Sequence, residues 1–174
     1  NTTASYNTAV GYQAGYSNTT GDITALGYLA GYANTTGTAN TALGSNSLRY
    51  TTTGGGNSAV GEFALYANTT GGINTAVGQA ALLSNTTGAS NTAVGQGSAL
   101  TNTTGYNNSS FGQASLYLNT TGTANTAIGG NDGSTAAALQ SNTTGSYNVA
   151  VGTSALKDNT TASYNTAVGY QAGY

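Results

Sequence analysis

Charged side chains are almost missing from this chain. Lys, Arg, Asp and Glu make up 3% of its 174 residues, where about 25% is usual for globular domains. The formal net charge of −2 leaves no basic surface for neutralising phosphates, so we expect no nucleic acid partner. Low charge with many small polar residues is also typical of disordered chains. Only the order of the residues distinguishes disorder from a fold.

Cysteine, histidine, proline, methionine and tryptophan are absent. Without Cys there are no disulfides and no thiolate ligands, and without His the commonest general base is missing. The carboxylates form no recurring pair, Lys157 has no recurring Ser partner, and Gly-rich stretches such as 54–56 lack the lysine of a phosphate-binding loop. We therefore expect no enzyme, and we assign no catalytic, metal-binding or cofactor-binding residue.

Long apolar runs are missing too, so we expect no membrane span in this stretch. The sequence starts at Asn1 in the middle of a repeated pattern, without Met and without a recognisable signal peptide. We expect it to be an internal stretch of a longer chain whose export signal lies elsewhere.

What the chain does have is a repeat that covers residues 1–174 as one continuous array. The unit is N-T-T-G-x-x-N-T-A-V-G-x-x-A-L-x-x, and its positions are numbered 1 to 17 below. Successive units begin 17 residues apart, except that the second has 16 residues and the eighth has 23. Such a strict period predicts stacked structural units rather than disorder.

A longer period lies above the first. Residues 1–16 and 159–174 are both NTTASYNTAVGYQAGY. We infer a super-repeat that spans 1–158, with 159–174 as the start of the next copy. The six extra residues of the eighth unit fall within 130–137, where Asn-Asp-Gly signals a turn. We expect a loop there that projects from one face, either as a structural feature or as a specific recognition loop.

Helices are disfavoured, because Gly recurs in every unit and the apolar residues show no 3.6-residue period. Short Thr-Ala-Val segments between Asn and Gly are typical of strands between turns. We predict an all-β parallel β-solenoid of about ten 17-residue coils within a longer fibre. Coils stacked about 4.8 Å apart would advance the axis by roughly 43 Å per super-repeat.

Two sets of residues have an expected structural role in this solenoid. Position 11 is Gly in every unit and is expected at a corner of the coil. Position 7 is Asn in every unit but the second, which has Ile23, and these amides are expected to bond to one another along the axis. The corner glycines are Gly11, Gly27, Gly44, Gly61, Gly78, Gly95, Gly112, Gly129, Gly152 and Gly169. The ladder asparagines are Asn7, Asn40, Asn57, Asn74, Asn91, Asn108, Asn125, Asn148 and Asn165.

Positions 9 and 10 are adjacent and both apolar, so in a strand their side chains face opposite ways. We expect the larger side chains of position 10 to line the core of the coil. The face made by position 9, which is mostly Ala, would then need cover from a second chain, and we expect a parallel homo-oligomer, with a trimer favoured. In the alternative arrangement, one of the two positions lies at a corner and both side chains turn inward.

Position 1 carries a possible modification signal, because Asn-Thr-Thr is an N-glycosylation sequon. The possible sites are Asn1, Asn18, Asn34, Asn68, Asn85, Asn102, Asn119, Asn142 and Asn159. A row of glycans would keep such a weakly charged fibre soluble. Alternatively, Asn-Thr serves only as a turn, which these residues favour.

The core N-T-A-V-G-x-x-A, as in residues 7–14, resembles the head repeats of bacterial trimeric autotransporter adhesins and repeats in phage tail-fibre-like proteins. The resemblance covers about half of each unit. It implies a left-handed parallel β-roll in which three chains associate. The adhesin unit is shorter and lacks the N-T-T-G segment, so no ligand site is carried over.

These patterns together favour a structural or adhesive segment of an extracellular repetitive fibre, on a cell or virion surface. The 13 Tyr residues, mostly at variable positions, could stack on a carbohydrate or another surface ligand, or could simply cover the coil. The alternative function is ice binding through Thr ladders at positions 2, 3 and 8. Against it, positions 2 and 3 are adjacent and cannot face one side of a strand together.

Overall fold

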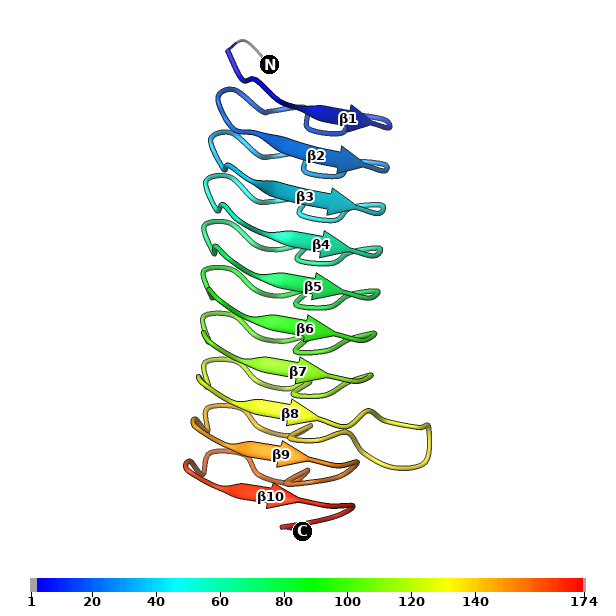
Figure 1. Ribbon diagram of the computed structural model, residues 1–174, viewed down its shortest axis with the longest axis vertical. Coiled ribbons are helices and arrows are strands. Elements are labelled where there is room, and N and C mark those ends of the chain that lie inside the picture. Colours follow the sequence, from blue (N-terminus) through cyan, green and yellow to red (C-terminus); the bar gives the residue numbers. More distant parts are fainter. Residues whose placement is uncertain (1–2, 174) are drawn as a thin grey trace.

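The computed structural model describes residues 3–173, which form a parallel β-solenoid with no helix among them (Figure 1). Each coil contributes one short strand, and each strand pairs with the next along the chain in a single ten-stranded sheet. The strands are β1 (Thr8–Val10), β2 (Ile23–Leu26), β3 (Asn40–Leu43), β4 (Ser58–Val60), β5 (Thr75–Val77), β6 (Thr92–Val94), β7 (Ser109–Phe111), β8 (Thr126–Ile128), β9 (Val149–Val151) and β10 (Thr166–Val168). The predicted fold class is confirmed.

The strands pair in parallel with each unit position opposite itself, as in Thr75 with Thr92 and Val77 with Val94. β-Branched residues at these positions favour the extended backbone. Hydrogen bonds between coils continue outside the sheet, where Thr69 N donates to Thr86 O at 2.9 Å. Each coil is therefore bonded to the next on more than one side, and the stack forms a rod.

The core is lined by position 9 and not by position 10, so the expected arrangement of these two positions is wrong. Ala76 is fully buried with Leu82, whereas the neighbouring Val77 is 37% exposed. The corner alternative is also wrong, since both positions lie within the strand and only one faces inward. Position 9 faces inward because the interior has room for only a small side chain there. The interior already holds Asn at positions 1 and 7 and Leu at position 15, which leaves room for a methyl group at position 9.

The one unit without Ala at position 9 supports this account of the interior. Ser110 replaces it, and its hydroxyl accepts a hydrogen bond from Ser98 Oγ at 2.7 Å. Ser98 Oγ also lies 3.1 Å from Ser115 Oγ. Both Ser98 and Ser115 occupy position 14, where most coils have Ala. The buried Ser110 hydroxyl thus accepts from Ser98 and donates to Thr92 O at 3.4 Å, which avoids the penalty for an unpaired polar group.

Ordinary residues adopt left-handed backbone at positions 6, 13 and 15 of the coil. Ser90 has φ of 57°, Ala80 of 56° and Leu82 of 51°. Each such residue costs about 1–2 kcal/mol relative to the right-handed conformation. The sequence predicted Gly or Asn at corners, but Leu takes position 15 because this backbone directs its side chain into the core.

The invariant glycines of position 11 have φ between +119° and +147° and lie at the end of each strand. A Cβ built on Gly78 would lie 2.7 Å from the carbonyl carbon of Gly95 in the next coil. The glycine is therefore required by the close approach of successive coils as well as by its own backbone angle.

The eighth coil departs from the stack after Gly129 and returns at Ala138, whose N–H donates to the Gly129 carbonyl at 2.9 Å. The intervening residues 130–137 form a loop that projects sideways at the level of β8 (Figure 1). The coils before and after it keep their pairing, with Thr126 opposite Val149. The insertion is thus accommodated without disturbing the rod.

Candidate functional site

The asparagines of position 1 form a buried ladder along the axis. Asn85 Nδ2 donates to Asn68 Oδ1 in the preceding coil and to Gly88 O in its own coil, each at 2.9 Å. Asn18, Asn34, Asn68, Asn85, Asn102, Asn119 and Asn142 are buried. Asn159 is half-buried at the last coil, and Asn1 lies outside the described residues.

This burial favours the structural interpretation of the Asn-Thr-Thr sequon over a row of glycans. A sugar is attached through Nδ2, and in the ladder both hydrogens of that atom point at protein acceptors inside the rod. A bulky group there would break two hydrogen bonds and would have no path to solvent. The sequon therefore has a structural role in this fold.

The asparagines of position 7 form a second ladder that runs beside the first. Asn91 donates through its backbone N at 3.0 Å and through Nδ2 at 3.2 Å to the same atom, Asn74 Oδ1. The pattern repeats from Asn40 through Asn57, Asn74, Asn91 and Asn108 to Asn125. Asn148 and Asn165 continue the line of axial bonds.

The two ladders meet at the carbonyl of position 4. Gly105 O accepts from Asn102 Nδ2 of its own coil at 3.0 Å and from Asn91 Nδ2 of the preceding coil at 2.8 Å. A Cβ on Gly105 would lie 2.4 Å from Asn102 Oδ1. The glycine of N-T-T-G is therefore tightly packed in this coil. It is less strictly required than the corner glycine, since position 4 is Ala in the first and tenth units and Ala162 O accepts the same two bonds.

The second coil interrupts both the period and the ladder of position 7. It lacks one residue at the corner occupied by position 6 elsewhere, and Ile23 stands in place of Asn. Ile23 N donates to Asn7 Oδ1 at 2.8 Å, but Asn7 Nδ2 is buried without a partner among the described residues. This is the least regular coil of the stack.

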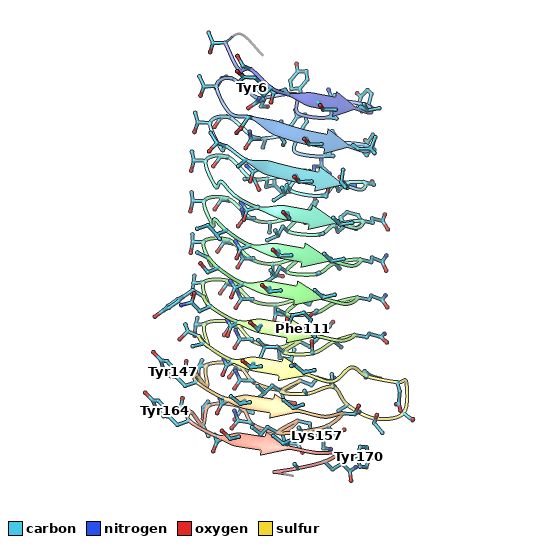
Figure 2. The ribbon with its side chains drawn as sticks, in the orientation of Figure 1. Tyr6, Phe111, Tyr147, Lys157, Tyr164 and Tyr170 are labelled. Atoms are coloured by element: carbon cyan, nitrogen blue, oxygen red, sulfur yellow. The ribbon has the colours of Figure 1, made fainter. Side chains whose placement is uncertain are left out.

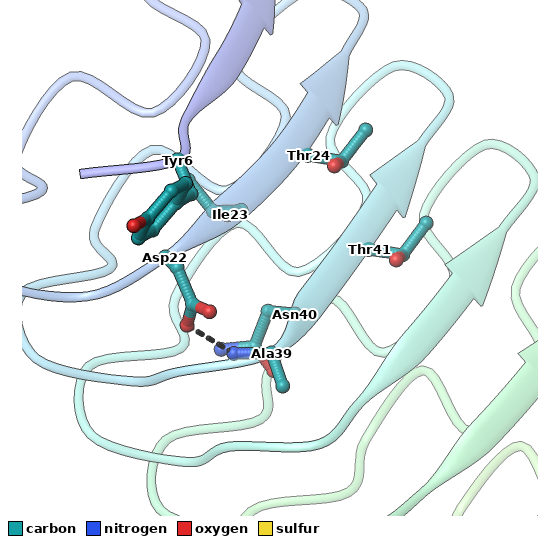
Figure 3. Close-up of a pocket in the computed structure, with 7 residues that line it drawn as sticks. All are labelled: Tyr6, Asp22, Ile23, Thr24, Ala39, Asn40 and Thr41. Atoms are coloured by element: carbon teal, nitrogen blue, oxygen red, sulfur yellow. Dashed lines mark hydrogen bonds between the residues drawn. The ribbon is translucent and has the colours of Figure 1, made fainter.

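The missing residue leaves an open cavity of about 300 Å³ beside β2 and β3, which we call the notch (Figure 3). Its lining residues are Tyr6, Asp22, Ile23, Thr24, Ala39, Asn40 and Thr41. The Asp22 carboxylate accepts a hydrogen bond from Ala39 N, as drawn in Figure 3. In regular coils the equivalent N–H bonds to a backbone carbonyl, as Ser90 N does to Gly72 O at 3.0 Å. The carboxylate thus replaces the missing backbone acceptor.

The outward side of the sheet carries the side chains of positions 8 and 10, and we call it the sheet face. Position 8 is mostly Thr or Ser, and position 10 is always apolar. Val77 and Phe111 are 37% and 40% exposed, and Phe111 lies on the face of the ribbon that carries the strands (Figure 2). The residues of position 10 are Val10, Leu26, Leu43, Val60, Val77, Val94, Phe111, Ile128, Val151 and Val168. They form a continuous apolar row along the rod.

Other surface residues also stack along the axis. The rings of Tyr12 and Tyr28 are 5.5 Å apart, and those of Tyr147 and Tyr164 are 5.1 Å apart and nearly parallel. Figure 2 shows the second pair projecting from one edge of the rod. Gln96 Nε2 donates to the exposed Gln79 Oε1 at 3.1 Å in a further ladder.

One Tyr hydroxyl and one Asp carboxyl group have shifted pKa values. The hydrogen bond between the hydroxyls of Tyr66 and Tyr50, 3.5 Å apart, raises the pKa of Tyr66 above its ordinary value. In the loop 130–137, the backbone N–H groups and hydroxyls of Ser134 and Thr135 donate to Asp132 Oδ1 and lower its pKa. These bonds hold the loop tip in a local turn.

Residues 3–173 contain no group of three or more acidic side chains placed to hold a metal ion, and no helix in them could cross a bilayer. Comparison with protein-family models, with curated proteins and with solved structures gave no match. Function is therefore inferred from the ladders, the sheet face and the notch of this chain itself.

The buried ladder predicts a large difference between two amide side chains in the sixth coil. Asn91→Ala removes the acceptor for the backbone N of Asn108 and for one hydrogen of its Nδ2, and should lower the free energy of unfolding by about 3 kcal/mol. Gln96→Ala removes the same chemical group from the exposed ladder and should change it by less than about 0.5 kcal/mol. Urea denaturation followed by circular dichroism measures both. Equal losses for the two variants would contradict the role given to burial.

The burial of position 1 also predicts the mass of the folded chain. The chain also has an exposed sequon outside position 1, Asn107-Asn108-Ser109, so Asn107 is first replaced by Gln. Produced in a host that glycosylates such sequons, the soluble folded Asn107→Gln protein should keep the mass of the bare polypeptide, about 17.0 kDa. Intact-mass spectrometry of the monodisperse fraction checks this. Hexose-containing mass increments on a chain with native circular dichroism would show that position 1 is accessible after all.

Proposed function

We propose that this chain is a rod-forming segment of an extracellular repetitive fibre, with a structural or adhesive role on a cell or virion surface. The observation that carries the proposal is the pair of buried Asn ladders, which bond each coil to the next along the axis. A coil of this kind adds to the stack without changing the cross-section, so length is set by the number of repeats. Such a chain is built to span distance.

The sheet face supports self-association of the rods. Its apolar row of position 10 runs the length of the described chain and carries no charged residue. Exposed apolar strips of this length mark interaction sites. The row repeats once per coil, at about 4.8 Å, so a partner with the same axial repeat can match it along its whole length. Another copy of this chain has that repeat.

We propose a parallel trimer in which three sheet faces meet around a common axis. Three-fold closure covers all three apolar rows and leaves none to start further association. The resemblance of N-T-A-V-G-x-x-A to trimeric adhesin repeats supports the same number of chains. The part of the chain that meets its copies is position 10, and not the Ala of position 9 from which an oligomer was first expected.

Lysines on the sheet face should separate the copies. In the Val77→Lys, Val94→Lys double variant, burying two unpaired ammonium groups per chain would cost several kcal/mol each. We expect the unaltered protein to sediment as three chains and this variant as one chain with unchanged circular dichroism. The matched control is Thr70→Lys, Thr87→Lys, which places the same charges in the same coils at the exposed position 3.

Sedimentation velocity combined with small-angle X-ray scattering distinguishes the outcomes. An elongated particle with the mass of three chains supports the proposal. The proposal would be contradicted by a single-chain mass for the unaltered protein, or by a single-chain mass for the control variant.

Ice binding is a second candidate, favoured by the hydroxyls of position 8. Thr24, Thr41, Thr75, Thr92 and Thr126 stand in a row on the sheet face beside the apolar row. The hydroxyls of position 2 are used inside the rod instead, as Thr86 Oγ1 donates to Thr103 O at 3.1 Å. A flat, uncharged array of hydroxyl and methyl groups suits an ordered layer of water.

A trimer would bury the same face, so the two candidates exclude each other. If ice binding is the function, the purified chain should be monomeric and show thermal hysteresis at millimolar concentration. Thr75→Tyr should then abolish most of that activity by disturbing the array. The absence of thermal hysteresis at that concentration would rule out ice binding.

A further inference from the structure

We propose that the notch binds one neutral hexopyranose ring, such as the terminal sugar of a glycan. The proposal goes beyond a fibre role and does not depend on it, because the notch is formed within one chain. It rests on the shortened second coil, on the Tyr6 ring and on the polar groups that surround the cavity.

One face of the Tyr6 ring has open space beside it. Tyr6 occupies position 6 with φ of 61°, and Tyr164 occupies the same position of the tenth coil with φ of 62°. Tyr164 stacks face to face on Tyr147 of the adjacent coil, at 5.1 Å with 1° between the ring planes. Flat groups on successive coils therefore fit together at this corner. Beside Tyr6 the second coil has no residue at position 6, so one face of its ring is open to a flat ligand.

The size and the lining of the notch suit a single pyranose ring. Tyr6 is 94% exposed and its ring stands over the notch (Figure 3). The apolar C–H face of a pyranose can stack on an aromatic ring while its hydroxyls point outward to polar partners. A cavity of about 300 Å³ lies at the small end of ligand pockets. It accommodates a single ring, and its open side leaves room for the rest of a glycan.

Polar groups surround the cavity. Asp22 uses Oδ1 to accept from Ala39 N, which fixes the carboxylate and leaves Oδ2 to accept from a ligand hydroxyl. Thr24 and Thr41 line the same cavity, and their hydroxyls can both donate and accept. No Lys or Arg lines it. A neutral sugar, which offers several hydroxyl donors, suits this set, whereas the carboxylate repels a sugar acid.

The experiment uses the full 174-residue chain and saturation-transfer NMR. The probes are the methyl glycosides of glucose, galactose and mannose, with methyl glucuronide as the anionic comparison. One small ring on an open site should bind weakly, with Kd on the order of 1 mM. We expect at least one neutral glycoside to bind and the glucuronide to bind at least about tenfold more weakly.

Three variants locate the site. Tyr6→Ser removes the stacking ring, and insertion of one Ala between Asp22 and Ile23 restores the 17-residue coil and fills the notch. Each should weaken binding at least about tenfold, equivalent to about 1.4 kcal/mol. Asp22→Asn keeps an acceptor for Ala39 N while removing the charge, and should reduce the preference for the neutral glycoside over the glucuronide.

The matched control is Tyr164→Ser, which removes an exposed Tyr in the same sequence context and should leave binding unchanged. Because Thr24 and Thr41 also belong to the sheet face, binding is measured in the Val77→Lys, Val94→Lys chain as well, where that face stays exposed. Binding by that single chain tests the notch separately from assembly. The proposal is overturned if no neutral glycoside binds, or if Tyr164→Ser weakens binding as much as Tyr6→Ser. It is equally overturned if the Ala insertion leaves binding intact in a chain with native circular dichroism.

Discussion

The side-chain amides of positions 1 and 7 impose the strictest constraint on this rod. Each amide must reach the one before it along the axis, and both donate to the same glycine carbonyl, as Asn102 and Asn91 do to Gly105. That geometry fixes the coil spacing, and in the sixth and seventh coils it leaves little room for a Cβ at Gly88 or Gly105. Because both amide hydrogens of these residues are used in the regular coils, as in Asn85 and Asn91, polar groups can fill the interior without the penalty for unsatisfied burial. A chain with few large apolar residues can therefore still fold.

The polar interior explains why the apolar residues are arranged as they are. With the centre occupied by amides and by Leu at position 15, position 9 is limited to a methyl group. The larger residues of position 10, such as Val77 and Phe111, therefore point outward. Apolar side chains, whose burial drives folding in most domains, lie here on the surface, where they form the continuous apolar row. The amide-filled interior thus keeps the coil narrow. It also places apolar side chains where another rod can contact them from the side.

The 17-residue period, with Gly and Asn at fixed places, was enough to predict a parallel β-solenoid and the line of Asn7, Asn40 and their equivalents. The facing of positions 9 and 10 was predicted wrongly, because a three-residue strand shows alternation but does not say which side is inside. The left-handed backbone of Leu82 had no signal, since Leu is not a residue expected there. The burial of Asn85 was also missed, because a sequon and a buried amide ladder have the same letters. The notch could have been anticipated from the one-residue deficit of the second unit.

Departures from the repeat are the places where a solenoid can acquire specific recognition. Regular coils present the same backbone and the same invariant positions as their neighbours, so a ligand that contacts these has many equivalent registers and no single site. The second coil removes one residue, exposes a face of the Tyr6 ring and brings in the Asp22 carboxylate to replace a lost backbone acceptor. The eighth coil adds residues and holds them in a turn around Asp132. In the second coil, the side chain that replaces the lost backbone acceptor carries a charge that the regular unit lacks. The second coil is therefore distinguishable from the regular coils along the rod.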